Sequence, residues 1–258
     1  MPRFILEITL QIGVVIPTYN EADNLPKLIS TLFALPLDLS VLVVDDGSPD
    51  GTGHIADELA RANRKLAVLH RSGKLGLASA YVQGFRCFLD RRVDVIGQMD
   101  ADLSHDPSAL VAMSKRLENC DVVLGSRYIR EGSVDTQWSF WRRGLSRWGN
   151  FYANTVLGLP FRDVTTGYRL WRSEALRDMP LNRIRSNGYA FQIEMAYLAH
   201  CLKYHINEVP IHFAERQSGR SKMSFQIQTE AALRVWQMPL IYRDIHPSNQ
   251  VVKINETI

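Results

Sequence analysis

The sequence has few cysteines and no long apolar run, and these two absences exclude several classes of protein. Its three cysteines, Cys87, Cys120 and Cys201, form no CxxC pair. We therefore expect neither a disulfide framework nor a zinc site, and this usage fits a reducing intracellular compartment. The longest uncharged stretch, Trp148–Phe161, is too short to span a bilayer and contains a proline. The start of the chain carries Glu7 instead of a continuous apolar core, so it does not resemble a secretory signal.

Several catalytic signatures are missing as well. No Ser-His-Asp order and no Cys-His pair supports nucleophilic hydrolysis, and the glycines around Lys74 do not have P-loop spacing. No internal repeat, low-complexity tract or linker interrupts the chain. We therefore expect residues 1–258 to form a single domain, since a chain of this length can bury about three quarters of its unfolded surface.

The charges are unevenly distributed along the chain. The net charge is +3, but residues 1–126 hold 12 basic and 16 acidic side chains, whereas residues 127–258 hold 18 and 11. An acidic first half can hold a metal ion, and a basic second half can attract an anion or an anionic surface. A nucleic-acid binder is not favoured, because acidic residues gather on the same molecule.

In the first half, short runs rich in β-branched residues alternate with helical patterns. Strands are expected at 12–16, 41–44, 66–69, 93–96 and 122–124, and helices at 23–34, 51–63, 76–90 and 107–118. Asp106 and Pro107 would begin the last of these helices as its N-cap and its first helical residue. The alternation is typical of an α/β fold with a mostly parallel twisted sheet, right-handed crossovers and flanking helices.

Beyond residue 127 this alternation stops. Residues 138–161 predict one or two amphipathic helices with an Arg-rich face, whose aromatic side chains serve either an ordinary core or a membrane surface. A loop at 162–172, a helix at 188–203, a strand at 207–213 and a final helix at 224–243 complete the chain. The second half is thus an elaborated extension of the same domain.

Acidic residues follow several of the expected strands, at the edge where parallel α/β sheets bind ligands. In an extended backbone, Asp100 and Asp102 would point to the same side. Two clustered carboxylates repel each other unless a cation lies between them, and Mg²⁺ or Mn²⁺ prefers carboxylate and phosphate oxygens. We therefore expect a divalent-cation site, the alternative being a solvated turn. His105 is either a further ligand or a hydrogen-bonded structural residue.

Further polar residues suit a nucleotide and an anion. Asp45 and Asp46 can accept hydrogen bonds from ribose hydroxyls or a base edge, although a turn rich in Gly, Pro and Asp forms without any ligand. Lys74, beside glycines and a helix start, is either a phosphate ligand or a surface lysine. The second half also carries hydrogen-bond donors that suit a phosphate, and most of them have no acidic residue nearby with which to pair. These donors are Arg127, Arg142, Ser146, Arg216 and Lys222. The loop 216–223 is expected to close over the bound anion.

Three of these segments resemble family 2 glycosyltransferases of the GT-A fold: Pro17–Glu21, Val43–Thr52 and Met99–His105. Four later segments are similar to dolichol- or polyprenol-phosphate mannosyltransferases: Gly125–Tyr128, Asp163–Arg169, Gly188–Glu194 and Glu215–Ser224. The first three are shared by many sugar transferases, and the last four are more specific. Together the resemblance covers residues 12–240.

The resemblance implies inverting transfer of mannose from GDP-mannose to a polyprenyl phosphate, dolichyl or undecaprenyl, giving polyprenyl-phosphate β-mannose. Residues 10–126 would hold the sugar nucleotide and Mg²⁺ or Mn²⁺, and residues 127–245 would hold the acceptor. The donor site would comprise Pro17, Tyr19, Glu21, Asp45, Asp46, Lys74, Asp100, Ala101 and Asp102. The metal would be held by Asp100 and Asp102, and Ser104 stands where some relatives carry a longer Gln ligand, so a water can intervene.

The acceptor phosphate would be held by Arg127, Arg142 and Ser146, while Arg216 and Lys222 would close over the phosphates. Catalysis would then rest on Asp100, Asp102, Arg127, Arg216 and Lys222. The resemblance places the protein at the cytoplasmic face of a membrane, held peripherally or with a small membrane-anchoring subunit. Two alternatives remain open: a polyprenyl-phosphate glucosyltransferase that uses UDP-glucose, and a non-catalytic module similar to phospho-acceptor receiver domains.

Overall fold

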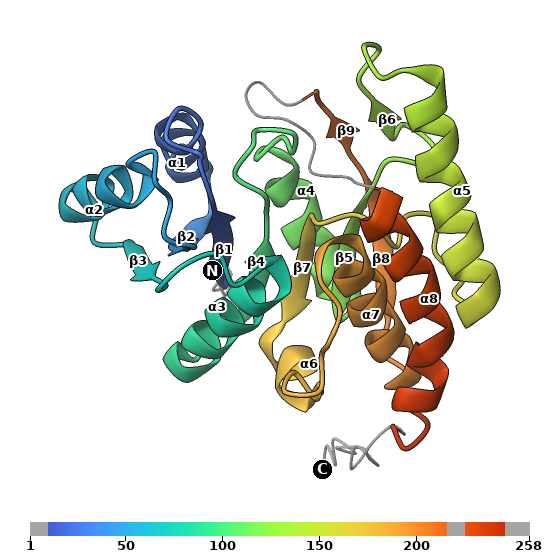
Figure 1. Cartoon of the computed structure of the whole chain (residues 1–258). Coiled ribbons are helices and arrows are strands. Elements are labelled where there is room, and N and C mark those ends of the chain that lie inside the picture. The colour runs from blue at the N-terminus through green and yellow to red at the C-terminus, as the bar shows by residue number, and fades with distance from the viewer. Residues whose placement is uncertain (1–9, 216–224, 246–258) are drawn as a thin grey trace, which may run out of the picture.

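The computed structural model describes residues 10–215 and 225–245 (Figure 1). Its central sheet contains β1 (Gln11–Thr18), β2 (Asp38–Asp45), β3 (Leu66–His70), β4 (Val95–Gln98), β5 (Val122–Ser126), β7 (Arg169–Arg172) and β8 (Ile206–Pro210). The spatial order is β3-β2-β1-β4-β7-β5-β8, and β7 alone runs antiparallel to its neighbours. A second, two-stranded sheet pairs β6 (Ser133–Val134) with β9 (His212–Phe213).

Helices cover both faces of the central sheet, and each face has its own apolar core (Figure 1). One face is packed by α1 (Leu25–Phe33), α2 (Thr52–Ala62) and α4 (Ala109–Arg116). The other is packed by α3 (Leu77–Arg91), α5 (Phe140–Leu157), α6 (Ser173–Asp178), α7 (Gly188–Cys201) and α8 (Phe225–Ile241). Burial on both faces explains why the parallel strands read as continuous apolar runs.

The predicted α/β class, the five strands and the four helices of the first half are confirmed. The carboxyl ends of β1, β2, β3 and β4 lie at one edge of the sheet because these strands are parallel. The polar segments that follow β1, β2 and β4 are therefore brought to that same edge. The fold thus places the expected donor and metal residues on one rim.

The prediction of a loop at 162–172 is wrong, because its end forms β7 between β4 and β5. Two arginines made this segment look exposed. The Arg169 side chain is fully buried and donates hydrogen bonds to the carbonyls of Val164 and Thr166. Arg172 donates to the carbonyls of Cys120 and Leu117. The cations are thus used inside the fold to satisfy backbone carbonyls.

The predicted start of the fourth helix is also wrong, by two residues. The α4 helix begins at Ala109, and Asp106 caps the turn before it, accepting hydrogen bonds from the Ser108 backbone N–H and hydroxyl. The 138–161 segment forms one helix, α5. Between β7 and α7 the short helix α6 was not expected from the sequence. The expected 207–213 strand is divided at Ile211 into β8, which pairs with β5 in the central sheet, and β9, which pairs with β6 in the second sheet. No helix in the described ranges is long and apolar enough to cross a membrane.

Candidate active site

The loop after β4 places Asp100 and Asp102 at the carboxyl edge of the sheet. The expectation of an extended backbone at this point is wrong: β4 ends at Gln98, the chain bends over residues 101–103, and Leu103 has a positive φ of 59°. The bend turns Asp102 back onto its own loop, where its Oδ1 accepts a hydrogen bond from the Ser104 N–H at 3.1 Å. Asp102 is buried, while the Asp100 side chain is partly exposed.

Asp100 is surrounded by groups from three different segments. Its Oδ1 accepts a hydrogen bond of 2.9 Å from the Tyr81 hydroxyl on α3. Its Oδ2 lies 3.8 Å from Nε2 of His105. A Cβ added to Gly167, in the loop before β7, would lie only 3.2 Å from the same Oδ2. Asp100 therefore lies in a close-fitting recess.

Both carboxylates act electrostatically on Tyr81 and His105. Burial, followed by the charges of Asp100 and Asp102, raises the pKa of Tyr81 well above its ordinary value, so its hydroxyl remains a donor. Burial lowers the pKa of His105, although the two aspartates oppose this shift. Tyr81 and His105 therefore both lie within the electrostatic influence of Asp100 and Asp102.

This donor set fits a hard divalent cation bound together with a ligand's phosphates. Asp100 and Asp102 supply carboxylate oxygens, and the buried Ser104 hydroxyl has no hydrogen-bond partner among the described residues. Within 10–215 and 225–245, no three His, Cys, Asp or Glu side chains form a metal-binding cluster. Two carboxylates alone would leave coordination positions for substrate phosphates and water, which Mg²⁺ commonly uses.

The expected nucleotide side is built around Asp45 and Asp46. The Asp45 carboxylate is buried and accepts hydrogen bonds from the hydroxyls of Thr18 and Ser48, so it shapes the turn that follows β2. Asp46 forms an ion pair of 2.6 Å with the buried Arg71 and accepts a hydrogen bond from the Gly76 N–H. These contacts tie the ends of β2 and β3 to the start of α3.

The other predicted donor residues lie around the same turns. The Nζ of Lys74 lies 4.3 Å from the ring centre of Tyr19. Glu21 accepts a hydrogen bond from Asn24, and its N–H donates to Thr52. Pro17 lies within β1, and Ala101 is buried beside the two aspartates. The structure thus brings both Lys74 and Tyr19 to the edge that carries Asp46.

Arg127, at the end of β5, is not the unpaired cation that the sequence indicated. It is buried and donates through Nε and Nη2 to both oxygens of Asp163, each at 2.6 Å, and its backbone N–H donates to the same carboxylate. Nη2 also donates to Thr165. Burial raises the pKa of Asp163, but the charge and hydrogen bonds of Arg127 outweigh this and hold it below its ordinary value of 3.8.

Arg142 on α5 is also paired with an acid, contrary to the sequence interpretation. Its Nη1 donates to both oxygens of Glu215, at 2.7 and 2.6 Å, and its guanidinium stacks 3.9 Å over the Trp138 ring. Both members of this pair are about one-third exposed, so a phosphate can reach them. Ser146, one turn further along α5, accepts a hydrogen bond from the Tyr128 hydroxyl.

Phe213 on β9 joins these residues to the aspartate loop. Its ring packs against His105, Trp138 and the Arg127 guanidinium, with separations of 5.2, 5.5 and 5.3 Å. Four segments therefore meet at Phe213: the loop after β4, the end of β5, the segment before α5, and β9 itself. The predicted metal and acceptor residues are thus linked through His105 and Phe213. Arg216 and Lys222 fall outside the described residues.

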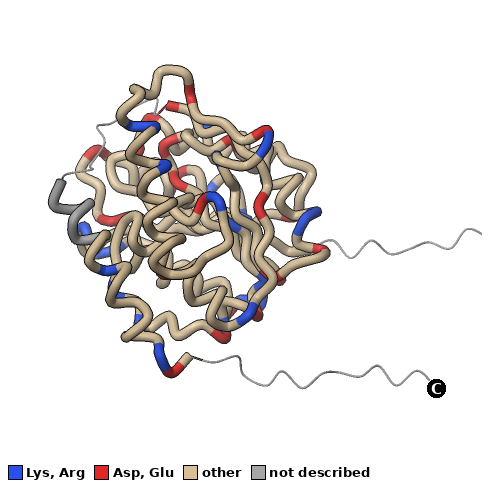
Figure 2. Tube along the Cα trace, turned by 90° about the vertical axis from the view of Figure 1, so that its right-hand side faces the viewer, with Lys and Arg blue, Asp and Glu red and all other residues tan. Residues whose placement is uncertain are grey.

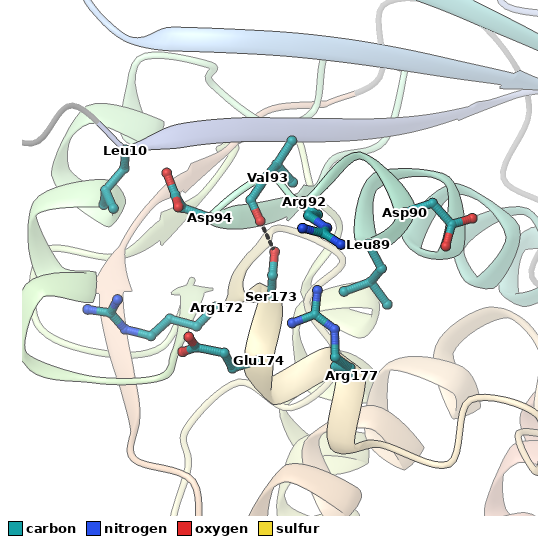
Figure 3. A pocket seen from close by; sticks show the side chains of 10 residues that line it. All are labelled: Leu10, Leu89, Asp90, Arg92, Val93, Asp94, Arg172, Ser173, Glu174 and Arg177. Atoms are coloured by element: carbon teal, nitrogen blue, oxygen red, sulfur yellow. Dashed lines mark hydrogen bonds between the residues drawn. The ribbon is translucent and has the colours of Figure 1, made fainter. Parts of the chain in front are cut away.

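A polar pocket at the opposite edge of the sheet is separate from this region (Figure 3). It is lined by residues near the amino end of β4 and the carboxyl end of the antiparallel β7, among them Asp94 and Arg172. None of the predicted site residues lines it. Acids and arginines alternate around it, so it presents no single sign of charge.

Sequence reasoning missed four residues that shape the site: Tyr81, Asp163, Gly167 and Glu215. Asp163, Gly167 and Glu215 lie inside motifs that were recognised, so the motifs could have drawn attention to them, but nothing indicated their partners. Tyr81 lies on a helix with an ordinary apolar pattern and carried no signal. Each contact joins segments distant in sequence, for example Arg127 and Asp163, 36 residues apart.

Comparison with known proteins agrees with this architecture. The chain is 42% identical to an undecaprenyl-phosphate mannosyltransferase of Micrococcus luteus, over 91% of this chain and 96% of the relative. It is equally identical to a polyprenol monophosphomannose synthase of Mycolicibacterium smegmatis, over 86% and 84%.

Solved structures with the same GT-A fold include glucosyl-3-phosphoglycerate synthase of Mycobacterium tuberculosis in complex with Mn²⁺, UDP and phosphoglyceric acid. Its TM-score is 0.64 at 16% identity, covering 93% of this chain and 80% of that one. The structure of mannosyl-3-phosphoglycerate synthase of Rubrobacter xylanophilus has a TM-score of 0.62 at 18% sequence identity, covering 91% of this chain and 74% of that one. The sequence profile of glycosyl transferase family 2 matches residues 13–179. The chain belongs to glycosyl transferase family 2.

Proposed function

We propose that this glycosyltransferase transfers mannose from GDP-mannose to a polyprenyl phosphate, with inversion at the anomeric carbon. The observation that carries this proposal is the 42% identity, over nearly the full length of both chains, to an enzyme named undecaprenyl-phosphate mannosyltransferase. Membership of a transferase family excludes the receiver-like module. Residues 10–126 would bind the donor, and residues 127–245 would bind the acceptor within the same domain.

In this proposal Asp100 and Asp102 hold Mg²⁺ or Mn²⁺ at the donor diphosphate. A Mn²⁺ complex of a protein with the same fold supports a divalent ion. The bound ion would stabilise the negative charge that develops on the departing nucleotide diphosphate. Asp46, Tyr19 and Lys74 lie at the same edge, where they would bind the nucleotide part of the donor.

The acceptor needs little activation. The second ionisation of a phosphate monoester has a pKa of about 6, so the attacking oxygen is already anionic at neutral pH and no strong general base is required. Positioning and charge neutralisation are needed instead, and the partly exposed Arg142 would provide them, whereas Arg127 is already paired with Asp163. In-line attack by this oxygen on an α-linked donor sugar would give a β-linked product.

The test is incubation of the protein with each sugar nucleotide, a short polyprenyl phosphate and Mn²⁺. We expect transfer from GDP-mannose and little from UDP-glucose, with the anomeric configuration read from the product's NMR coupling. Preferential transfer from UDP-glucose would contradict the assigned donor. Failure to bind any sugar nucleotide would contradict the whole proposal.

Arg142→Ala is expected to raise the KM for polyprenyl phosphate about 10–100-fold and to leave the KM for the sugar nucleotide nearly unchanged. A charge-assisted hydrogen bond contributes about 1.5–3 kcal/mol, which corresponds to this range. Arg143→Ala is the matched control, because Arg143 donates only to the backbone carbonyls of Asp135 and Thr136. Equal effects of Arg142→Ala on the two KM values would rule out the acceptor assignment.

We also propose peripheral membrane contact through α5 and α8, which lie side by side and are joined by a hydrogen bond from Tyr152 to the Ala232 carbonyl (Figure 1). The aromatic residues of the 138–152 segment were expected to serve either the core or a membrane surface, and they divide between the two. Trp138 is buried, whereas Trp141 is 84% exposed. Large exposed side chains on the two helices are Phe140, Trp141, Leu145, Trp148, Phe151, Leu233, Trp236 and Leu240. Figure 2 views this side and shows basic and acidic residues interspersed along it. The α5 helix itself carries three arginines and no acidic residue, as suits an anionic bilayer.

The double variant Trp141→Glu/Trp236→Glu is expected to reduce binding to vesicles of phosphatidylglycerol and phosphatidylcholine at least about tenfold, measured by co-sedimentation. Removing two aromatic side chains from the lipid and adding two anions opposes both the apolar and the electrostatic parts of binding. Leu75→Glu, which charges an exposed apolar residue outside α5 and α8, serves as the control. Unchanged vesicle binding of the double variant would overturn the proposal that α5 and α8 contact the membrane. A separate anchoring subunit would then be needed for membrane contact.

A further inference from the structure

The hydroxyl of Tyr81 makes one hydrogen bond, to Oδ1 of Asp100, and the Tyr81 ring is held rigidly. It is fully buried and stacks on Phe85 and Phe191, with centroids 5.9 and 5.8 Å away. A phenylalanine would fill the same apolar space without needing a polar partner. What the hydroxyl adds is the hydrogen bond to Asp100, which restricts the orientation of this carboxylate.

His105 approaches the other oxygen of the same carboxylate. Its ring is 1% exposed and packs between Tyr168 and Phe213. Neither ring nitrogen has a hydrogen-bond partner among the described residues, and a buried polar group without a partner is costly. Nε2 lies 3.8 Å from Oδ2 of Asp100, so a shift of about 1 Å would give an ordinary hydrogen bond.

Gly167 completes the recess on a third side. A side chain there would press against both Asp100 oxygens, at 3.2 and 3.4 Å. Asp100 is thus confined by α3, by its own loop and by the loop that precedes β7. A carboxylate confined in this way has few alternative rotamers. A ligand that binds to Asp100 therefore loses little free energy to ordering its side chain.

We propose that Tyr81 and His105 are positioning residues that jointly orient the Asp100 carboxylate for the cation and diphosphate of the donor. The inference rests on the proposed function, because it assumes that Asp100 binds the cation. Tyr81 would fix Oδ1, and a shift of about 1 Å between the His105 ring and the carboxylate would let Nε2 donate to Oδ2. Hydrogen-bonded partners of this kind orient metal-binding carboxylates in many proteins.

The test is the affinity of Mn²⁺ for the complex of the protein with GDP, measured from the electron paramagnetic resonance signal of free Mn²⁺. Tyr81→Phe and His105→Leu are each expected to weaken it about 10–100-fold, the usual effect of removing such a partner. His105→Gln keeps an N–H donor and should restore most of the affinity. Tyr204→Phe removes a tyrosine–aspartate hydrogen bond of 2.6 Å at Asp178 and should change nothing.

A purely structural role predicts a different pattern, in which thermal stability falls but Mn²⁺ affinity and the donor KM of the folded protein do not change. Wild-type Mn²⁺ affinity in Tyr81→Phe would overturn the inference, and this variant decides the matter should His105→Leu fail to fold. Absence of any Mn²⁺ binding by the wild-type protein with GDP or UDP would instead contradict the proposed function, and this inference with it.

Discussion

Asp102→Asn is expected to reduce sugar transfer about 10³-fold or more while leaving the fold intact. The asparagine oxygen can still accept the hydrogen bond from the Ser104 N–H, so the loop after β4 keeps its shape. What the variant loses is one of the two negative charges available to the cation. A metal that stabilises developing charge contributes several kcal/mol, and each 1.4 kcal/mol is about tenfold in rate.

A matched control exists at the other end of β4. Asp94 also accepts a hydrogen bond from a backbone N–H, that of Gln11, at 2.9 Å, but it lies at the opposite edge of the sheet. Asp94→Asn should therefore transfer sugar at nearly the wild-type rate. Activity would be measured with saturating donor and acceptor, and folding by thermal unfolding. A folded Asp102→Asn protein with wild-type activity would contradict the metal assignment.

The position of the aspartates could be predicted from the sequence because it follows from strand polarity alone. Once β1, β2 and β4 are parallel, the residues after them must meet at one edge. The local geometry could not be predicted in the same way. The premise of an extended backbone failed at Leu103, whose left-handed conformation redirects the loop and turns Asp102 towards Ser104. The sequence gives little sign of this conformation, because leucine rarely adopts it.

The ion pairs of the acceptor side lay beyond sequence reasoning for a different reason. Asp163 is 36 residues from Arg127, and Glu215 is 73 residues from Arg142, so neither acid is a neighbour of its arginine along the chain. These ion pairs form only once the chain has folded, because the sheet and the strands β8 and β9 bring distant segments together. Similarly, β7 was missed because two arginines, the buried Arg169 and the partly exposed Arg172, flank its apolar pair, Leu170 and Trp171.

The pairing of Arg127 also has a consequence for acid stability. The pKa of Asp163 lies below its ordinary value of 3.8 in the folded protein because Arg127 outweighs the effect of burial. A group whose pKa is lower in the folded state stabilises the fold at pH values above its unfolded pKa. This contribution is complete above about pH 4 to 5 and is lost as the pH falls towards the folded pKa.

Asp163→Ala is therefore expected to destabilise the protein by about 3–5 kcal/mol at neutral pH, because it leaves a buried guanidinium without its counter-ion. For a chain of this size, that corresponds to a fall in Tm of about 10 °C. Differential scanning calorimetry measures this change, and the variant should also lose the part of the pH dependence below about 4 that Asp163 contributes.

Asp244→Ala is the matched control for this variant, since Asp244 forms a similar two-pronged pair with Arg183, but at the surface, where 61% of its side chain is exposed. Water solvates both charges there, so little change in Tm is expected. The contrast isolates burial as the main difference, because each pair joins one arginine to both oxygens of an aspartate, at 2.6 Å in the buried pair and at 2.7 and 2.9 Å at the surface. If Asp163→Ala melted within about 2 °C of the wild-type protein, the Arg127 charge would have to be compensated by another group, such as a bound anion, and the argument from burial would fail.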